Sequence, residues 1–249
     1  MGRGLSLLAS FTYPKCIDQL GTPISQSEEG NRNLYAEDRT NLGLDRGLCG
    51  VDNRLRTVYS FVYQLPVGRG KHFLISGGPL AKVLGDWAVS GIATFSDGEW
   101  ESVQDNFDIS NTGEPYQRPD AYCNPNLPLS QRTTGEWFKS ACFGNVGLDN
   151  PADPTTYRYG TAARAMIELP GINDGDIAVL KDVSVSERMR FQFRAESINT
   201  MNHVSLGSPN GTIGGATLSC VGLPCQGTFP TISTAGSPRQ IQLALKLLW

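Results

Sequence analysis

The sequence contains little of what most enzymes and nucleic-acid-binding proteins need. Charged residues make up 18% of the 249 residues, below the usual fraction, and the formal net charge is −3. No basic run is present, so we expect no nucleic-acid partner. Histidine occurs only as His72 and His203, and neither stands in a pattern typical of a nucleophile–histidine–acid set. We therefore expect no enzymatic activity, no catalytic residue and no cofactor.

Long apolar runs and metal-binding motifs are also missing. The longest apolar region, 73–95, is interrupted by Lys82, Asp86 and several glycines, so it does not predict a membrane-spanning helix. Aspartates are frequent in the polar stretches, but none follows the Asp-x-Asp-x-Asn-Gly spacing of a calcium loop. No cysteine pair has the CxxC spacing of a zinc knuckle. We therefore expect no bound metal.

The cysteines fall into neighbouring pairs along the chain, and none lies in a predicted strand. The pairs are Cys16 and Cys49, Cys123 and Cys142, and Cys220 and Cys225. This placement favours three local disulfides and an oxidising compartment. The connectivity stays open, because six cysteines allow many pairings, and free buried thiols are the alternative.

The final stretch, 238–249, has the clearest two-residue alternation. One parity is apolar and consists of Ile241, Leu243, Leu245, Leu247 and Trp249. Such alternation predicts a β-strand with one apolar face. Chain ends of soluble proteins are commonly polar. An apolar face that runs to a terminal tryptophan is instead typical of the last strand of an outer-membrane β-barrel. We expect these five residues to form the signal that barrel-assembly machinery reads, with an ordinary core strand as the alternative.

Further stretches alternate in the same way. The predicted strands lie near residues 4–13, 53–66, 86–97, 176–185, 188–200 and 238–249. Each is about ten residues long, which lets a tilted strand span a bilayer. The connections alternate between long (14–52, 99–175 and 201–237) and shorter (67–85 and 186–187). This asymmetry predicts an all-β fold, an antiparallel meander of about six long strands with long outer loops that forms part of an outer-membrane β-barrel.

The apolar face of the predicted sheet carries aromatic residues near the strand ends. Tyr13 and Phe95 lie at the outer ends, and Tyr63, Trp87 and Trp249 lie at the inner ends. Aromatic residues at both ends are typical of the two girdles that a barrel presents to the membrane interfaces. We therefore expect this face to contact outer-membrane lipid.

The polar face carries Arg190, Arg194 and Glu196. We expect these residues to face a water-filled lumen, either as contacts to a plug or a solute or as cross-strand ion pairs. Lys181 conflicts with the pattern, because it has the lipid-facing parity near the middle of 176–185. A lysine there costs about 2–4 kcal/mol, unless a bulge, snorkelling or contact with a neighbouring strand relieves it.

Four segments resemble one family. The first consists of 53–56 (NRLR) together with 63–71 (YQLPVGRGK). The other three are 85–92 (GDWAVSGI), 188–203 (RMRFQFRAESINTMNH) and 237–249 (SPRQIQLALKLLW). They are similar to segments of Oar-like TonB-dependent receptors, which are abundant in Acidobacteria, and the resemblance covers nearly the whole chain. It implies a receptor in the cell outer membrane of a Gram-negative-type bacterium that takes up a nutrient or chelate, driven by TonB.

The resemblance also implies that residues 1–249 are the C-terminal part of such a receptor barrel, with the plug and N-terminal domains absent. The expected partners are the remainder of the barrel and its plug, TonB through the absent N-terminal region, the barrel-assembly machinery and outer-membrane lipid. Two alternatives stay open. One is a secreted, disulfide-stapled β-sandwich binding module, and the other is a surface adhesion protein anchored by the barrel.

Overall fold

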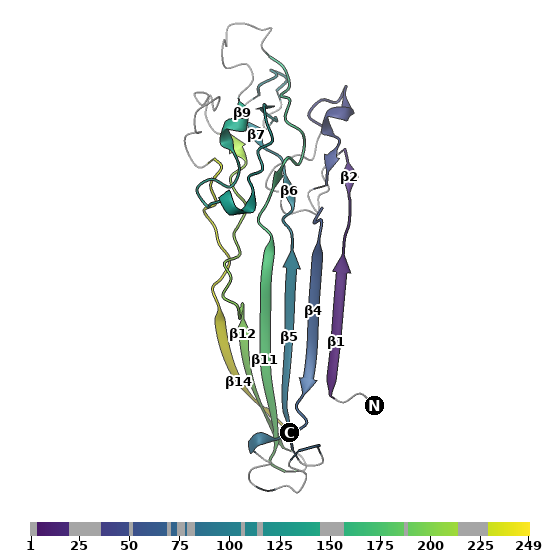
Figure 1. The fold of residues 1–249 in the computed structure, drawn as a ribbon, viewed down its shortest axis with the longest axis vertical. Coiled ribbons are helices and arrows are strands. Elements are labelled where there is room, and N and C mark those ends of the chain that lie inside the picture. The colour runs from purple at the N-terminus through teal and green to yellow at the C-terminus, as the bar shows by residue number, and fades with distance from the viewer. Residues whose placement is uncertain are drawn as a thin grey trace.

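The protein has two parts: a sheet of long strands, and a body of folded loops at one end of that sheet (Figure 1). The computed structural model describes residues 4–19, 36–49, 52–68, 71–73, 78, 83–105, 108–113, 117–144, 157–186, 189–213 and 229–249. The long strands are β1 (Leu5–Thr12), β4 (Arg56–Gln64), β5 (Trp87–Ser96), β11 (Ile172–Ser184), β12 (Arg190–Ile198) and β14 (Gln240–Leu248). Each coincides with a stretch whose alternation predicts a strand.

These strands form one six-stranded sheet in the order β1-β4-β5-β11-β12-β14. All neighbours are antiparallel, so the sheet is the predicted up-and-down meander. A β-sandwich requires two packed sheets. In the described part of the chain the long strands make a single sheet, so the sandwich alternative is wrong. No helix in that part is both long and apolar enough to cross a membrane.

Strand β11 begins earlier than the sequence predicts. Alternation places its start near residue 176, but the structure begins it at Ile172. The segment Gly171-Ile172-Asn173-Asp174-Gly175 has the composition of a turn, which is why the pattern ends there. Residues 172–175 nevertheless pair with 93–96 of β5, and this ladder extends the strand.

The register confirms that the sheet has one apolar face. Opposed residues of antiparallel strands point to the same side. One row across all six strands consists of Leu7, Phe61, Gly91, Ile177, Ser197 and Ile241. Leu7 is 68% exposed and Ile241 is 71% exposed, and large apolar side chains are exposed in neighbouring rows as well. A continuous apolar surface of this kind requires an apolar environment outside the protein.

The outer loops fold into a body that we call the outer cap, defined as the described residues of 13–55, 97–171 and 199–239. Its short strands are β2 (Ile17–Asp18), β3 (Gly47–Leu48), β6 (Trp100–Glu101), β7 (Gln104–Asp105), β8 (Asp120–Ala121), β9 (Phe143–Gly144), β10 (Ile167–Glu168) and β13 (Thr212–Ile213). Three 3-10 turns join them: η1 (Leu42–Asp45), η2 (Leu129–Gln131) and η3 (Ser140–Cys142). The cap lies at the end of the sheet opposite the shorter turns (Figure 1).

The buried core of the protein lies in the outer cap rather than in the sheet. Its members come from 97–171 and 199–239: Val103, Trp137, Phe138, Cys142, Phe143, Ala162, Ile167, Ile213, Phe229 and Ile232. The rings of Phe138, Phe143 and Phe229 meet edge to face, with centroids 5.0–6.1 Å apart. The sequence predicts a long loop over 99–175, and in the structure this segment supplies most of a packed core.

Candidate functional site

Two disulfides hold the outer cap together. Cys16 is joined to Cys49 and Cys123 to Cys142, with Cα atoms 5.4 and 5.0 Å apart. Both pairs agree with the sequence analysis; Cys220 and Cys225 lie outside the described residues. The first bond ties the segment after β1 to the segment before β4, and the second ties η3 to the chain beside β8. They therefore fix loops that the sheet itself does not hold.

One group of side chains has the spacing of a metal site. The candidate ligand atoms of Cys16, Asp18 and Cys49 lie within 4.8 Å of one another. Both sulfurs belong to the disulfide, however, and a disulfide sulfur is not the thiolate that zinc requires. This group therefore does not fit a metal ion.

A buried arginine joins two outer loops. Arg118 donates from Nη1 to Asp45 Oδ1 at 2.7 Å, from Nε to the Ala162 carbonyl and from Nη2 to the Leu44 carbonyl, both at 3.0 Å. It also forms an ion pair with Glu37, and both side chains are about 95% buried. Burial raises the pKa of the Glu37 carboxyl, and the Arg118 charge only partly offsets this. The pair links the first outer loop to the second.

Two aspartates of the cap have lowered pKa values because they accept several hydrogen bonds. Partial burial alone would raise the pKa of Asp108, but the N–H groups of Gly113 at 2.6 Å and Thr112 at 3.0 Å lower it overall. Burial alone would also raise the pKa of Asp120. The Arg158 guanidinium lowers it overall, because it donates hydrogen bonds of 2.6 and 2.8 Å to the carboxylate. Both carboxylates therefore stabilise the conformation of their loops.

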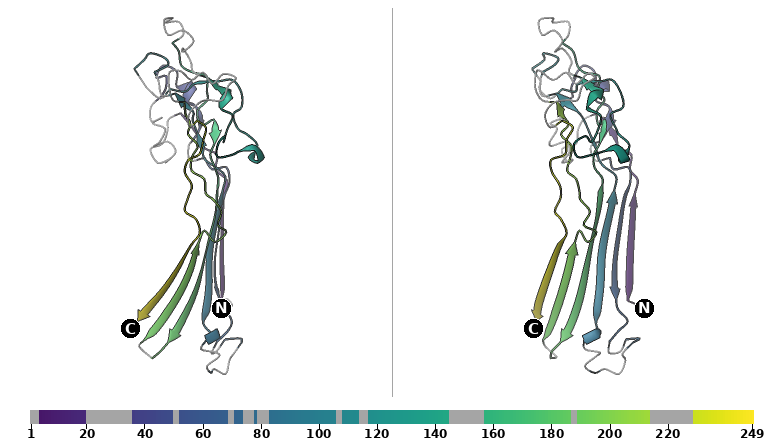
Figure 2. Two further views of the ribbon diagram at one scale, coloured as in Figure 1. Left: turned by 90° about the vertical axis from the view of Figure 1, so that its left-hand side faces the viewer. Right: turned by 60° about the vertical axis from the view of Figure 1, so that its left-hand side comes forward.

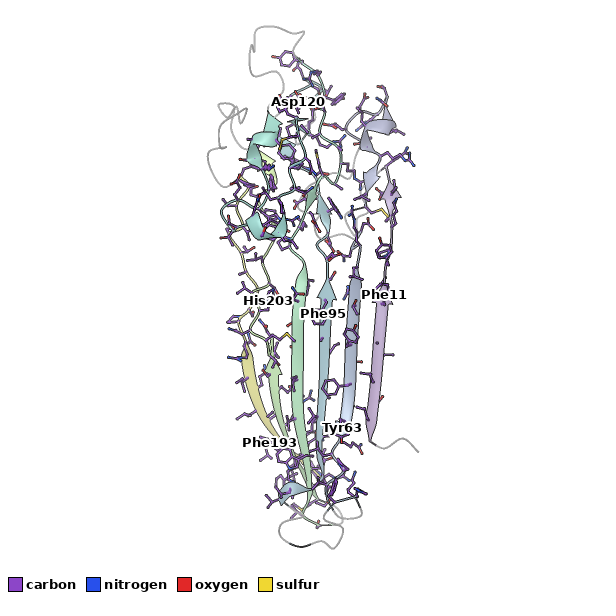
Figure 3. The ribbon with its side chains drawn as sticks, viewed as in Figure 1. Phe11, Tyr63, Phe95, Asp120, Phe193 and His203 are labelled. Carbon is purple, nitrogen blue, oxygen red and sulfur yellow. A yellow bond between two sulfur atoms is a disulfide. The ribbon has the colours of Figure 1, made fainter. Side chains whose placement is uncertain are left out.

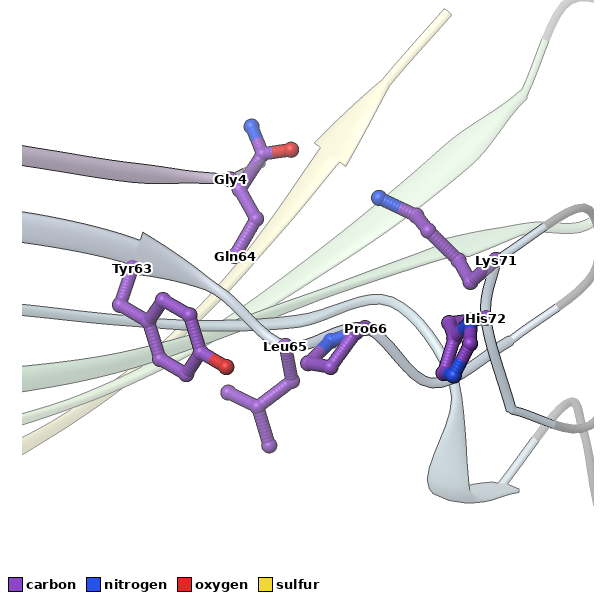
Figure 4. Close-up of a pocket in the computed structure, with 7 residues that line it drawn as sticks. All are labelled: Gly4, Tyr63, Gln64, Leu65, Pro66, Lys71 and His72. Carbon is purple, nitrogen blue, oxygen red and sulfur yellow. The ribbon is translucent and has the colours of Figure 1, made fainter. Parts of the chain in front are cut away.

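The polar face brings the predicted lumenal residues onto one strand. Arg194 forms an ion pair with Glu196, two residues along β12. Arg190 lies apart from them, at the inner end of β12, and lines a recess of about 340 Å³ together with Lys71, Asp86 and Asp182. A neighbouring recess of about 570 Å³ is lined by Tyr63, Gln64, Leu65, Pro66, Lys71 and His72 (Figure 4). The inner end of the sheet thus carries both charge signs close together.

The predicted assembly residues form an exposed row along β14. The exposed fractions are 71% for Ile241, 70% for Leu243 and Leu245, 39% for Leu247 and 90% for Trp249. Their row continues across β12, where Leu243 faces Ala195 and Leu245 faces Phe193. β14 is also an edge of the described sheet, so both its apolar side chains and one set of backbone groups are open to a partner.

Lys181 proves compatible with the apolar face. β11 extends to Ser184, and Lys181 pairs directly with Trp87, the first residue of β5, so it lies near the inner end and not at mid-strand. Its Nζ donates to the carbonyls of Val83 at 2.9 Å and Gly85 at 2.6 Å. It also lies 4.9 Å from the centre of the Trp87 ring. Contact with the neighbouring turn and aromatic ring therefore relieves the cost.

The segments that carry the family resemblance act as turn formers. Asn199, at the end of β12, has a φ of 49° and bonds to the backbone of His203 through both Nδ2 and Oδ1, at 2.8 and 2.9 Å. At the inner end the Asp86 N–H donates to the Val67 carbonyl at 3.1 Å, which joins 63–71 to 85–92. Sequence reasoning recognised these segments but missed their role. The asparagines in 199–203 were the available signal, because Asn tolerates a positive φ.

Figure 3 shows how the labelled side chains are distributed along the sheet and the cap. Phe95 lies at the outer end of β5, and Phe193 and Tyr63 lie toward the inner end of the sheet, while Asp120 lies far out in the cap (Figure 3). Aromatic residues thus occur near both ends of the apolar face, as the two-girdle prediction requires.

Comparison with known proteins agrees with this architecture. No curated protein and no solved structure gives a significant match to the chain. The model of the outer membrane beta barrel domain family matches residues 1–242, which is almost the whole length. The chain therefore belongs to the outer membrane beta barrel domain family, and it is a protein of the outer membrane.

Proposed function

We propose that this chain is part of an Oar-like TonB-dependent receptor that takes up a nutrient or chelate. The observation that carries the proposal is the breadth of the sheet. Figure 2 shows the six strands as a gently curved sheet with β1 and β14 at opposite edges. In a small barrel six strands cover most of the circumference, so a sheet this open suits a barrel of many strands, such as those of transporters.

The resemblance of four segments to Oar-like receptors supports the same proposal. The Asn199 bonds to His203 and the Asp86 bond to Val67 build strand ends, so the segments that contain them point to a shared barrel. The transport step itself rests on the resemblance. In the proposed receptor this chain supplies lumen wall, with Arg190, Arg194 and Glu196 facing water, a plug or a solute. In such receptors TonB acts through the plug.

The edges of the sheet suggest the assembly partners. We propose that β1 and β14 pair with further strands of a complete barrel, because unpaired edge strands in a bilayer leave backbone groups unsatisfied. We also propose that the apolar row ending at Trp249 is read by barrel-assembly machinery during insertion. The role we propose for the protein is transport, without an enzymatic step.

Dependence of uptake on TonB tests the proposal. In the bacterium that carries the gene, one strain lacks the gene and another lacks TonB, and both receive a panel of labelled ferric chelates and oligosaccharides. We expect both strains to lose uptake of the same solute, and a plasmid copy to restore it in the first strain. Normal uptake of every solute in the strain without the gene would contradict the proposal.

Surface adhesion is a second candidate, because the outer cap is a compact, disulfide-held body at the tip of the sheet. Cells lacking the gene would then lose attachment to a surface while all uptake stays normal. The same two strains therefore separate the two functions.

A further inference from the structure

A recess opens where the outer cap meets the sheet. It has a volume of about 280 Å³ and lies between η2 and the outer ends of β5 and β11. In the left view of Figure 2 the teal coil of η2 projects from the cap to one side of the sheet, away from the side toward which β12 and β14 bend. η2 therefore overhangs the convex side of the sheet, which is the outer side of a barrel.

The recess lies at the height of the outer membrane interface. Asn173 lines it, and Asn173 is the direct cross-strand partner of Phe95, the aromatic residue at the outer end of β5. Phe95 is 36% exposed and contacts Tyr59 on the same face, with ring centroids 6.5 Å apart. Aromatic residues at strand ends mark the level of lipid headgroups. A group bound in the recess would thus sit among headgroups.

The wall on the cap side carries an arginine that is already held in place. The Arg132 side chain is only 7% exposed and donates from Nε to the Leu127 carbonyl and from Nη2 to Glu168 Oε2, both at 2.8 Å. Its guanidinium lies 5.3 Å from the centre of the Trp137 ring, whose Nε1 donates to the Glu168 carbonyl. Nη1 makes no hydrogen bond within the described part of the chain, so its N–H groups are available to a ligand.

The remaining walls combine polar groups with an apolar surface. The side chains of Asn173 and His203 make no hydrogen bonds to described residues, and both line the recess. Leu129, Leu169, Val204 and Leu206 supply apolar contacts. The charge of Arg132 is compensated by Glu168, and Asp97 lies close by, so the recess does not favour a phosphate. Donors and acceptors around an apolar wall fit a neutral ligand with many hydroxyl groups and an apolar face, which is the chemistry of a sugar ring.

We propose that this recess binds a sugar ring at the outer membrane surface. Its height beside Phe95 suits a sugar carried by a glycolipid of the surrounding leaflet, and a free oligosaccharide carries the same chemistry. The site is independent of TonB-driven uptake, because it lies on the outer side of the sheet and not on the polar face.

Binding is measured by calorimetry on the protein purified in detergent from outer membranes of its own bacterium. The probes are the rough lipopolysaccharide of that bacterium and the oligosaccharide that acid hydrolysis releases from it. The test variant combines Asn173→Ala with His203→Ala, and the matched control is His72→Ala at the inner end of the sheet. We expect the test variant to bind about tenfold or more weakly, since two hydrogen bonds are lost, and the control to bind as wild type.

The two probes separate the sources of the sugar. Binding of the intact glycolipid alone assigns the recess to membrane lipid, and binding of both probes assigns it to the sugar irrespective of its carrier; either result supports the proposal. Arg132→Lys keeps the charge but loses the planar donor, and we expect it to weaken binding. No binding of either probe, or equal binding by wild type and the double variant, would overturn the proposal.

Discussion

The sheet and the outer cap are stabilised by different kinds of interaction. In the sheet, side chains such as Leu7 and Leu243 are about 70% exposed, and the strands contact one another mainly through backbone ladders. In the cap, Val103 and Phe143 are fully buried, and disulfides and ion pairs join distant loops. The sheet therefore depends on an apolar environment outside the protein, and the cap depends on its own interior.

This difference shows that regular alternation and a buried core are separate properties of the chain. The most regular stretch, 238–249, buries almost nothing, while the least regular stretches supply the core. Changes that act on buried charge and on cross-links should affect the cap, and changes that act on lipid contact should affect the sheet.

Arg118→Met should have the largest effect and should act only on the cap. The change leaves the buried carboxylates of Glu37 and Asp45 without their cation, which costs about 3–5 kcal/mol. We expect rapid hydrogen exchange in 36–49 and 157–162 with protection of the long strands unchanged. Arg158→Met is the control, because Arg158 is half exposed and water replaces part of its interaction with Asp120, so we expect a smaller loss than for the buried Arg118. Equal effects of the two substitutions would contradict the importance of burial.

Leu243→Arg should have the next largest effect and should act on the sheet. A charge on the lipid-facing side of a strand costs about 2–4 kcal/mol near the bilayer centre. The neighbouring change Ala244→Arg, on the polar face, should cost little. Reversible folding into lipid vesicles, followed by the mobility shift of folded barrels on gels, measures both. A larger loss for Ala244→Arg would reverse the assignment of the two faces.

Replacing Cys123 and Cys142 with serine removes a cross-link that spans 19 residues and should destabilise the cap by about 3 kcal/mol. The sheet contains none of these cysteines, so its assembly in the membrane should be unaffected. Limited proteolysis of whole cells provides the measurement, with faster cleavage expected within 117–144. Unchanged cleavage of the variant would mean that the phenylalanine cluster alone holds the cap.

Acidification should have the smallest effect, and it should act on the cap. The pKa of Asp108 in the folded protein lies below its ordinary value of 3.8, so this carboxylate contributes stability above that value. The contribution disappears as the pH falls through the lower folded-state pKa. We expect hydrogen exchange of 108–113, corrected for its intrinsic rate, to rise below about pH 4 in wild type and to be independent of pH in Asp108→Asn. A pH dependence retained by the variant would assign the titration to another group.

The sequence predicts the sheet well because one physical rule governs it. Two-residue alternation locates all six long strands, and the register confirms the apolar face row by row. The alternation does not predict the start of β11, because Asn173, Asp174 and Gly175 are turn-forming residues that pairing with β5 holds in an extended conformation. The pattern also does not predict how Lys181 is accommodated on the apolar face, because its ammonium group donates to the Val83 and Gly85 carbonyls, which belong to another segment.

The outer cap is predicted poorly because its structure depends on contacts between distant segments. Arg118 and Glu37 are 81 residues apart, and no local pattern links them. Gly98 appears in the sequence only as the end of a strand. In the structure a Cβ at this position would lie 1.7 Å from the Leu169 carbonyl oxygen, so only glycine allows the backbone at residue 98 to pack directly against the backbone at residue 169. The disulfide pairs are the exception, since their neighbouring placement in the chain was a usable signal.

The central claim is that one face of the sheet contacts lipid and the other contacts water. Spin labels placed singly at positions 243 and 244 of the protein in lipid bilayers test it most directly, through their accessibility to oxygen and to a water-soluble nickel complex. We predict that label 243 is relaxed mainly by oxygen, which concentrates in lipid, and label 244 mainly by nickel. Equal accessibility of the two labels, or the reverse preference, would contradict it.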